Sequence, residues 1–220
     1  RRSSDLHDVL RGRGAFTCLC STLEDLRGRK TPFTLSMCVT TDNVADMADV
    51  VDFAADAGAG NVHFMWYFVR GRGSRSRFAP VETIFDNLMR AADRSVARGV
   101  TIDNLEALKT QVFAPAGTLH DGSSAGWESL AMGPDNRIYP SAALVGVPEL
   151  ATDTEGGLIQ AWRESPVLER IRRATVANLS SPLRFILGGG DMDHSYLHGG
   201  TFLGDDPYAR LHELLALWLI

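Results

Sequence analysis

The sequence predicts an α/β protein whose first half alternates parallel strands with helices and whose second half holds a hairpin and several helices. Three observations lead to this fold class. Between Thr31 and Gly99, apolar strand-like runs alternate with helical runs through short loops, which is typical of a parallel α/β unit. The second strand candidate, residues 61–69, is apolar almost throughout, as expected of a parallel strand covered on both faces. After Gln111 this rhythm ends, and a turn sequence indicates an antiparallel hairpin.

The first predicted elements are a helix over 16–26, a strand over 32–40 (PFTLSMCVT) and a helix over 42–58. Asp42 and Asn43 are candidate N-caps of this second helix. Its apolar residues recur at helical spacing. They are Val44, Met47, Val51, Ala54 and Ala55.

The βα rhythm continues with a strand over 61–69 (NVHFMWYFV) and a helix over 80–99. Pro80 near the start and Gly99 past the end fit the usual distribution of these residues at helix termini. A short strand is expected within 100–105. Two strands and a fragment form too small a parallel sheet, so we expect further strands before Arg1 in the natural protein.

We place a domain boundary near Gln111, which divides the chain into 1–111 and 112–220. A Gly-, Ser- and Pro-rich loop is expected over 114–126. The segment 127–140 predicts a hairpin turning at Gly-Pro-Asp-Asn. Two helical pieces follow over 156–177, interrupted by a proline. An amphipathic helix that opens with Asp-Pro closes the chain over 206–220.

The formal net charge of −5 indicates no nucleic-acid partner, and no apolar run approaches the ~20 residues that span a bilayer, so no membrane partner is expected. Arginines cluster over 11–13 and 70–77, where they either hold one anionic group or form solvated loops. The three cysteines, Cys18, Cys20 and Cys38, lack the spacing of a disulfide framework or a metal knuckle. We interpret them as structural and the protein as cytoplasmic.

An ordered series of segments resembles the radical S-adenosylmethionine superfamily. DVLRGRGAF (8–16) is similar to an RG-x-G-x-F segment of that family, and residues 33–73 resemble its fifth strand, Asn-led helix and sixth strand with a Gly/Arg loop. AGWESLAMGPDNRIYPSAALVG (125–146) resembles the entry to a SPASM or twitch extension. GGLIQAWRESPVLERIR (156–172) resembles the helix of that module, and RFILGGGDMDHSY (184–196) lies where the module has a Cys-Gly-Gly-Cys-like turn.

The resemblance implies the C-terminal half of a partial (β/α)6 barrel with parallel strands, followed by a small SPASM-like extension of a hairpin and helices. It also implies S-adenosylmethionine and a 4Fe-4S cluster as cofactors of the intact protein. The family's C-x-x-x-C-x-x-C loop, which holds that cluster, is absent from this chain. Residues other than cysteine stand at the expected auxiliary-cluster positions, and serine replaces a thiolate poorly. They are Ser123, Ser124, Ser141, Ser180, Ser181 and Ala209.

By the same resemblance, the cofactor-binding residues follow the two main strands. They are Thr41, Asn43, Arg70 and Arg72. The matching family positions contact the ribose and the methionine carboxylate of S-adenosylmethionine, and an arginine fork suits a carboxylate. The alternatives remain a plain helix cap for Asn43 and a surface loop for the arginines.

The segment 185–200 contains His194 and His198 four residues apart, preceded by Asp191 and Asp193. On a helix, such histidines could bind a metal with an aspartate, or an Asp–His pair could transfer protons. However, the flanking glycines leave little room for a two-turn helix, and aspartates commonly cap turns. We therefore predict a structural loop beside a site, with a polar loop facing the substrate and a metal site as alternatives.

The predicted substrate-facing residues are Asp191, Asp193, His194 and Tyr139, and no residue is assigned as a metal ligand. Tyr139 and Trp127 flank the hairpin, where they face either a peptide or the core. The leading hypothesis is the C-terminal portion of a radical enzyme that uses an external electron donor. Such an enzyme generates a 5′-deoxyadenosyl radical and modifies a peptide or small metabolite. The alternatives are a non-catalytic module that binds a peptide or partner, and a metal-dependent hydrolase using residues 191–198.

Overall fold

A computed structural model describes residues 2–113 and 124–220, and it divides into two compact units. The sheet unit comprises Arg1–Thr110 with Leu214–Ile220, and the hairpin unit comprises Gln111–Glu213. Most of the predicted loop, including Ser123, lies outside the described residues. In the part of the chain that is described, no helix is both long and apolar enough to cross a bilayer.

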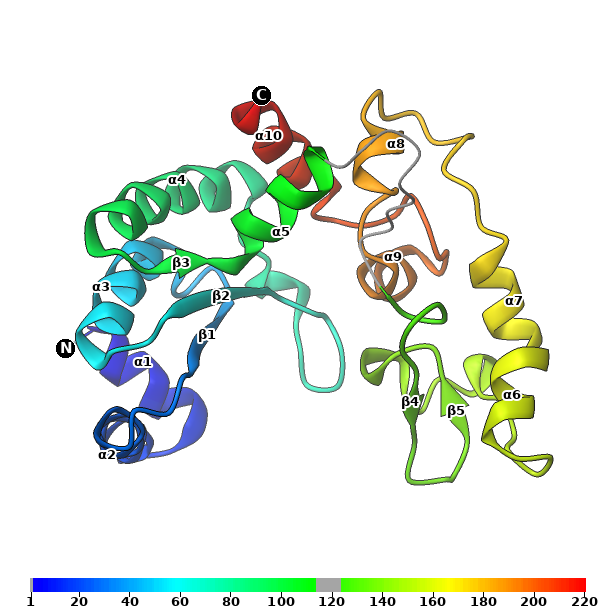
Figure 1. The fold of residues 1–220 in the computed structure, drawn as a ribbon, viewed down its shortest axis with the longest axis horizontal. Helices are drawn as coiled ribbons and strands as arrows, with labels where there is room; N and C mark the ends of the chain where they lie inside the picture. Colours follow the sequence, from blue (N-terminus) through cyan, green and yellow to red (C-terminus); the bar gives the residue numbers. More distant parts are fainter. Residues whose placement is uncertain (1, 114–123) are drawn as a thin grey trace. The chain divides into compact units, whose positions relative to one another are not determined.

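The sheet unit contains a three-stranded parallel sheet in the order β1-β2-β3 (Figure 1). Strands β1 (Thr34–Val39), β2 (Asn61–Trp66) and β3 (Thr101–Ile102) lie where the sequence predicts strands. Thr34 pairs with Asn61, and Asn61 pairs with Thr101. The α/β class and the parallel sheet are thereby confirmed.

Two of the helices confirm the βα rhythm. Helix α3 (Met47–Ala57) follows the short 3-10 turn Val44–Asp46, and α4 (Val81–Arg98) follows Pro80. Both end at a glycine in the left-handed region, with φ of 84° at Gly58 and 67° at Gly99, where other residues would be strained.

Of the remaining helices of the sheet unit, the sequence predicts one and not the other two. Helix α2 (Ala15–Gly28) was predicted, whereas α1 (Arg2–Arg11) and α5 (Asp103–Val112) were not. A 3-10 turn at Arg75–Arg77 follows the loop after β2.

Helices α3 and α4 pack together over one face of the sheet (Figure 1). Successive side chains of a strand point to opposite faces of the sheet, so every second residue lies on the face that these helices cover. Its buried strand residues are Val39, Val62, Phe64 and Ile102, and the helices contribute Met47, Val51, Ala54, Ile84, Leu88 and Ala91. On the opposite face, Thr34, Ser36 and Cys38 of β1 are exposed.

The hairpin unit begins with the predicted hairpin, formed by β4 (Ala131–Met132) and β5 (Ile138–Tyr139) in antiparallel pairing. Its turn places Asn136 at a φ of 60°, a conformation that asparagine tolerates better than most residues. Short 3-10 turns follow at Ala142–Leu144 and Pro148–Leu150.

The predicted break at Pro166 is also confirmed. Helix α6 (Leu158–Glu164) ends before it, and α7 (Pro166–Arg172) starts on it, capped by the Ser165 hydroxyl, which accepts from Leu168 N at 3.2 Å. Three further helices complete the chain: α8 (Arg184–Leu187), α9 (Met192–Gly199) and α10 (Ala209–Leu219). The core joins hairpin and helices through Ile138, Tyr139, Leu144, Leu150, Leu168 and Met192.

Candidate functional site

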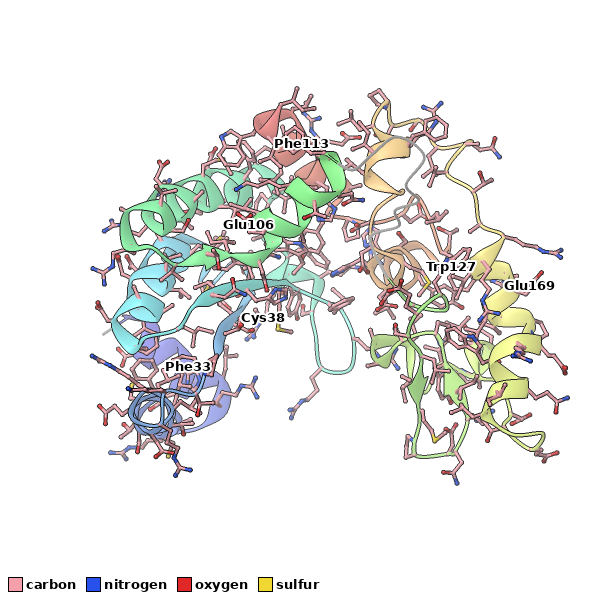
Figure 2. All side chains as sticks on the ribbon, in the orientation of Figure 1. Phe33, Cys38, Glu106, Phe113, Trp127 and Glu169 are labelled. Carbon is pink, nitrogen blue, oxygen red and sulfur yellow. The ribbon has the colours of Figure 1, made fainter. Side chains whose placement is uncertain are left out.

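The face of the sheet opposite α3 and α4 carries polar and partly exposed side chains. They are Thr34, Ser36, Cys38, Asn61, His63, Met65 and Thr101. Figure 2 labels Cys38, whose exposed side chain lies on this face. Buried parallel sheets are normally apolar on both faces, so a polar face indicates a surface that meets solvent or a polar ligand.

A hydrogen-bonded network crosses this open face and links all three strands, since Asn61 Nδ2 of β2 also donates to Thr34 Oγ1 of β1 at 3.4 Å. His63 Nδ1 lies 2.8 Å from Asp103 Oδ1, and Asn61 Nδ2 donates to Asp103 Oδ2 at 3.2 Å. Thr101 Oγ1 donates to Asn61 Oδ1 at 3.2 Å. The side chains of His63 and Asp103 are 39% and 40% exposed, so this pair could hold or transfer a proton.

Asp103 directly follows the two-residue strand β3 and is the first residue of α5. The next residue, Asn104, continues the ladder with its side chain: its Oδ1 accepts from Phe64 N at 2.8 Å and its Nδ2 donates to Phe64 O at 2.9 Å. The start of α5 is thereby fixed against β2. Sequence reasoning missed the His63–Asp103 pair, although a histidine alternating with Val62 and Phe64 was a usable signal.

The predicted cofactor-binding residues lie in the loops that follow β1 and β2. Because Val39 pairs with Trp66 in a parallel register, both loops leave the same edge of the sheet. Asn43 Oδ1 accepts from Thr40 N at 2.8 Å, and its Nδ2 donates to Cys38 O at 2.9 Å. The Asn43 amide therefore closes the loop after β1.

Arg70 and Arg72 lie in a tight turn after β2. Gly73 N donates to Arg70 O at 2.9 Å, and a Cβ at Gly73 would lie 2.9 Å from Phe68 O, so the turn depends on this glycine. Arg70 is half-buried and Arg72 is exposed. After β1, the exposed Thr41 donates its N–H to Arg77 O at 3.1 Å, which ties the two loops together.

The hairpin unit contains a pocket of about 180 Å³. Segments from Leu179 to Glu213 form its wall, so it lies entirely within this unit. Its polar lining residues are Ser180, Ser181, Arg184, His212 and Glu213, and its small ones include Gly189, Gly190, Gly204 and Ala209. The pocket thus combines both signs of charge with little side-chain bulk.

Hydrogen bonds fix the charged groups of this pocket. Ser181 Oγ donates to Glu213 Oε1 at 2.5 Å, and Arg184 Nη1 donates to Ser181 O at 3.0 Å. Arg210 Nη1 lies 3.3 Å from Glu213 Oε2. Arg184 Nε is buried and has no hydrogen-bond partner among the described residues.

Asp206 joins the pocket wall to α9. Its Oδ2 accepts from Asp191 N and its Oδ1 accepts from Tyr208 N, both at 2.8 Å. His212 Nδ1 lies 3.9 Å from Asp206 Oδ2. A Cβ at Gly190 would lie 2.6 Å from that same oxygen, so the close approach requires glycine.

The predicted substrate-facing residues have structural partners. Asp191 caps α9 by accepting from His194 N at 2.9 Å, which confirms the expected aspartate cap. Ser141 Oγ donates to Asp193 Oδ1 at 2.6 Å.

The two predicted aromatic residues are buried. His194 is buried against Tyr208 with ring centroids 5.0 Å apart. Tyr139 is 1% exposed and donates to Asp135 Oδ2 at 2.6 Å.

The expectation that glycines leave too little room for a two-turn helix is wrong. Helix α9 has eight residues, because the glycines lie outside its first turn and Gly200, at a φ of 80°, terminates it. His194 is nevertheless buried while His198 is exposed. Within residues 2–113 and 124–220, no group of three His, Cys, Asp or Glu side chains is arranged to hold a metal ion.

Burial shifts the titration of this polar region. It raises the pKa of Asp191 to about 7, with further contributions from the negative charges of Asp193 and Asp206. Burial lowers the pKa of His194 to about 4 and also lowers the pKa of His212, against the opposing charge of Asp206. Both histidines are therefore neutral at pH 7.

The chain matches no family model, and no curated protein is significantly similar to it in sequence. A functional assignment therefore depends on residue chemistry and on geometry.

Proposed function

We propose that this chain is the C-terminal portion of a radical S-adenosylmethionine enzyme whose extension has lost its auxiliary-cluster ligands. One observation carries the proposal. Three of the positions that the resemblance assigns to former ligands line one pocket of the hairpin unit, and a fourth is bonded elsewhere in that unit. Ser180, Ser181 and Ala209 line one pocket, and Ser141 is bonded to Asp193, in the segment that resembles the Cys-Gly-Gly-Cys-like turn.

The sheet unit supports the same proposal. A partial (β/α)6 barrel has helices outside and functional side chains inside, and its functional loops follow the carboxyl ends of the strands. The sheet has α3 and α4 on one face and polar residues on the other, and it would represent the last strands of such a barrel. The missing strands would then continue from the free edge of β1.

In this proposal the loops after β1 and β2 hold S-adenosylmethionine. Arg70 and Arg72 bind its methionine carboxylate, because a guanidinium donates paired hydrogen bonds to a carboxylate. Thr41 offers a hydroxyl to the ribose, and Asn43 shapes the loop that presents it. The 4Fe-4S cluster would be held by residues upstream of this chain.

When bound, the cluster and S-adenosylmethionine supply a 5′-deoxyadenosyl radical, which removes a hydrogen atom from a peptide or small metabolite. The residues of this chain would orient the cofactor and exclude water from the open face. His63, held by Asp103, is placed on that face to give or take a proton from a bound substrate. Three free cysteines fit a reducing, cytoplasmic setting.

The test is anaerobic turnover by the protein extended to its natural start. With the cluster reconstituted and dithionite as electron donor, we expect 5′-deoxyadenosine to form, as detected by mass spectrometry. Arg70→Ala together with Arg72→Ala should raise KM for S-adenosylmethionine about tenfold or more, since each charge-assisted hydrogen bond contributes roughly 1.5–3 kcal/mol. Arg75→Ala, in the 3-10 turn that follows this loop, is the matched control and should leave KM unchanged. An upstream sequence without the cysteine triad, or no 5′-deoxyadenosine, would overturn the proposal.

A non-catalytic module that binds a peptide or partner is the second candidate. It is favoured by the absence of cysteine from residues 111–213 of the sequence. Stoichiometric peptide binding by a protein that does not bind S-adenosylmethionine would establish this alternative.

A further inference from the structure

We propose that the pocket of the hairpin unit binds an amino-acid-sized zwitterion, a small molecule that carries both a carboxylate and an ammonium group. The inference follows from the lining of the pocket and does not depend on the proposed function. It would hold equally for an enzyme and for a binding module.

The size of the pocket sets the first limit. About 180 Å³ compares with an apolar cavity of roughly 150 Å³ that holds benzene in another protein. Gly189, Gly190 and Ala209 form part of the wall, and Leu179 crowds Gly189, where an added Cβ would lie 2.8 Å from the leucine Cδ1. The pocket therefore admits a small ligand with a short side chain.

Arg184 provides the site for the carboxylate. Its Nη1 is fixed on Ser181 O at 3.0 Å, and its guanidinium carbon lies 4.6 Å from the centroid of the Phe185 ring, so the fork is held in place. A carboxylate is the group that best satisfies a guanidinium, and Arg184 is one of the residues that line the pocket. Ser180, exposed at the pocket, can add a hydroxyl.

Glu213 provides the site for the ammonium. Its side chain is 21% exposed, and each of its oxygens already accepts one interaction, from Ser181 and from Arg210. A carboxylate offers about four acceptor positions, so capacity remains for an ammonium donor. His212, which is 23% exposed, lies beside Glu213 in the lining and is a further polar partner.

The pairing of charges decides the ligand class. Arg184 and Glu213 line the same pocket with opposite charges. Glu213 is already paired with Arg210 at 3.3 Å, so a simple anion would satisfy Arg184 but leave the remaining acceptor positions of Glu213 unused, and a simple cation would leave Arg184 without an anionic partner. A zwitterion matches both, and this difference gives the pocket its selectivity.

The test titrates the full 220-residue chain with four probes: glycine, L-alanine, acetate and methylamine. Binding is followed by two-dimensional amide NMR, so that shifts can be assigned to pocket residues. We expect glycine and L-alanine to bind about tenfold or more tightly than acetate and methylamine, because only they satisfy both charges. Equal affinities for all four probes, or no shift at pocket residues, would overturn the proposal.

Variants separate the two ends of the ligand. Arg184→Gln should weaken the binding of L-alanine about tenfold or more and leave the affinity for methylamine unchanged. Glu213→Gln should weaken the binding of L-alanine by a similar factor and leave the affinity for acetate unchanged. Arg173→Gln, which removes an exposed arginine paired with Glu169, is the matched control and should bind like the parent chain. Amide spectra that otherwise superpose show that each variant is folded. Undiminished L-alanine binding by a folded Arg184→Gln chain would contradict the assignment.

Discussion

The sheet unit and the hairpin unit are stabilised in different ways. In the sheet unit, long helices α3 and α4 bury apolar residues against regular strands, and Met47, Val51 and Leu88 are fully buried there. In the hairpin unit the strands have only two residues each, and a buried aspartate, Asp206, joins segments that lack regular structure. Apolar packing dominates the first unit, whereas the second adds polar contacts that depend on glycine geometry.

This difference has a functional consequence. A regular sheet presents side chains at fixed intervals, so its open face is a broad surface with polar side chains. Short elements held by polar contacts instead enclose a small pocket with charges of both signs. Four predictions test the comparison, from the largest expected effect to the smallest.

Leu88→Ala should produce the largest loss of stability. Leu88 is fully buried in α4, and a leucine-to-alanine change in a core typically costs about 2–5 kcal/mol through lost transfer energy and a cavity. Hydrogen exchange measured by mass spectrometry should show loss of protection in α3 and α4. Val96→Ala, on the same helix but 85% exposed, is the control and should change stability by less than about 0.5 kcal/mol. Unchanged protection in Leu88→Ala would contradict the description of the core.

Gly190→Ala should be the most damaging glycine substitution in the hairpin unit. Its φ of 89° is strained for alanine, and the new Cβ would meet buried Asp206. We expect a loss of about 2–3 kcal/mol from strain and overpacking together. Gly200→Ala is the matched control, since its φ is 80° but no atom lies within 4 Å of its added Cβ. It should cost only about 1 kcal/mol. Equal losses in urea denaturation would show that Asp206 is not the obstacle.

The contrast between the units also explains what the sequence could predict. Apolar spacing at Val44, Met47 and Val51 specified α3, because burial against a sheet imposes that period. Proline and glycine marked the ends of α4 for steric reasons. Helix α5 was missed although Leu105, Leu108 and Val112 recur at helical spacing. Its start is fixed by long-range contacts of Asp103 and Asn104 with β2, which no local pattern encodes.

In the hairpin unit, local chemistry was predictable and long-range chemistry was not. The cap formed by Asp191 follows from short-range geometry. The pocket depends on Ser181 meeting Glu213 across 32 positions, and on Asp206 meeting Asp191 across 15. No periodicity encodes such contacts.

Asp191→Asn should change how stability depends on pH. The pKa of Asp191 is raised to about 7, above its usual value of 3.8, so its contribution to stability is complete below about pH 4 and is lost as the pH rises through 7. Asparagine can still cap α9 but does not titrate. From pH 4 to 7 the variant should gain roughly 1–2 kcal/mol relative to the parent chain, since partial water access reduces the full linkage. Urea denaturation at several pH values measures this difference.

The lowered pKa of His194, about 4, has the opposite effect on stability over the same range. The neutral His194 side chain stabilises the folded state fully above pH 6.5, and this contribution is lost as the pH falls through 4. Because His194 is present in both proteins, its effect largely cancels in the comparison. A constant difference between parent and variant from pH 4 to 7 would contradict the raised pKa of Asp191.

Exposed ion pairs should have the smallest effect, and the effect should be equal in the two units. Arg29 pairs with Asp25 at 3.0 Å in the sheet unit, and Arg173 pairs with Glu169 at 2.6 Å in the hairpin unit. Both arginine side chains are more than 70% exposed, and such pairs typically contribute less than about 0.5 kcal/mol. Arg29→Gln and Arg173→Gln should therefore each shift the urea midpoint only slightly, and raised salt should remove the difference. Suppose that Arg173→Gln alone lowered the free energy of unfolding by more than about 1 kcal/mol. Surface charge would then contribute to the stability of the hairpin unit, and buried polar contacts would not be the only difference between the two units.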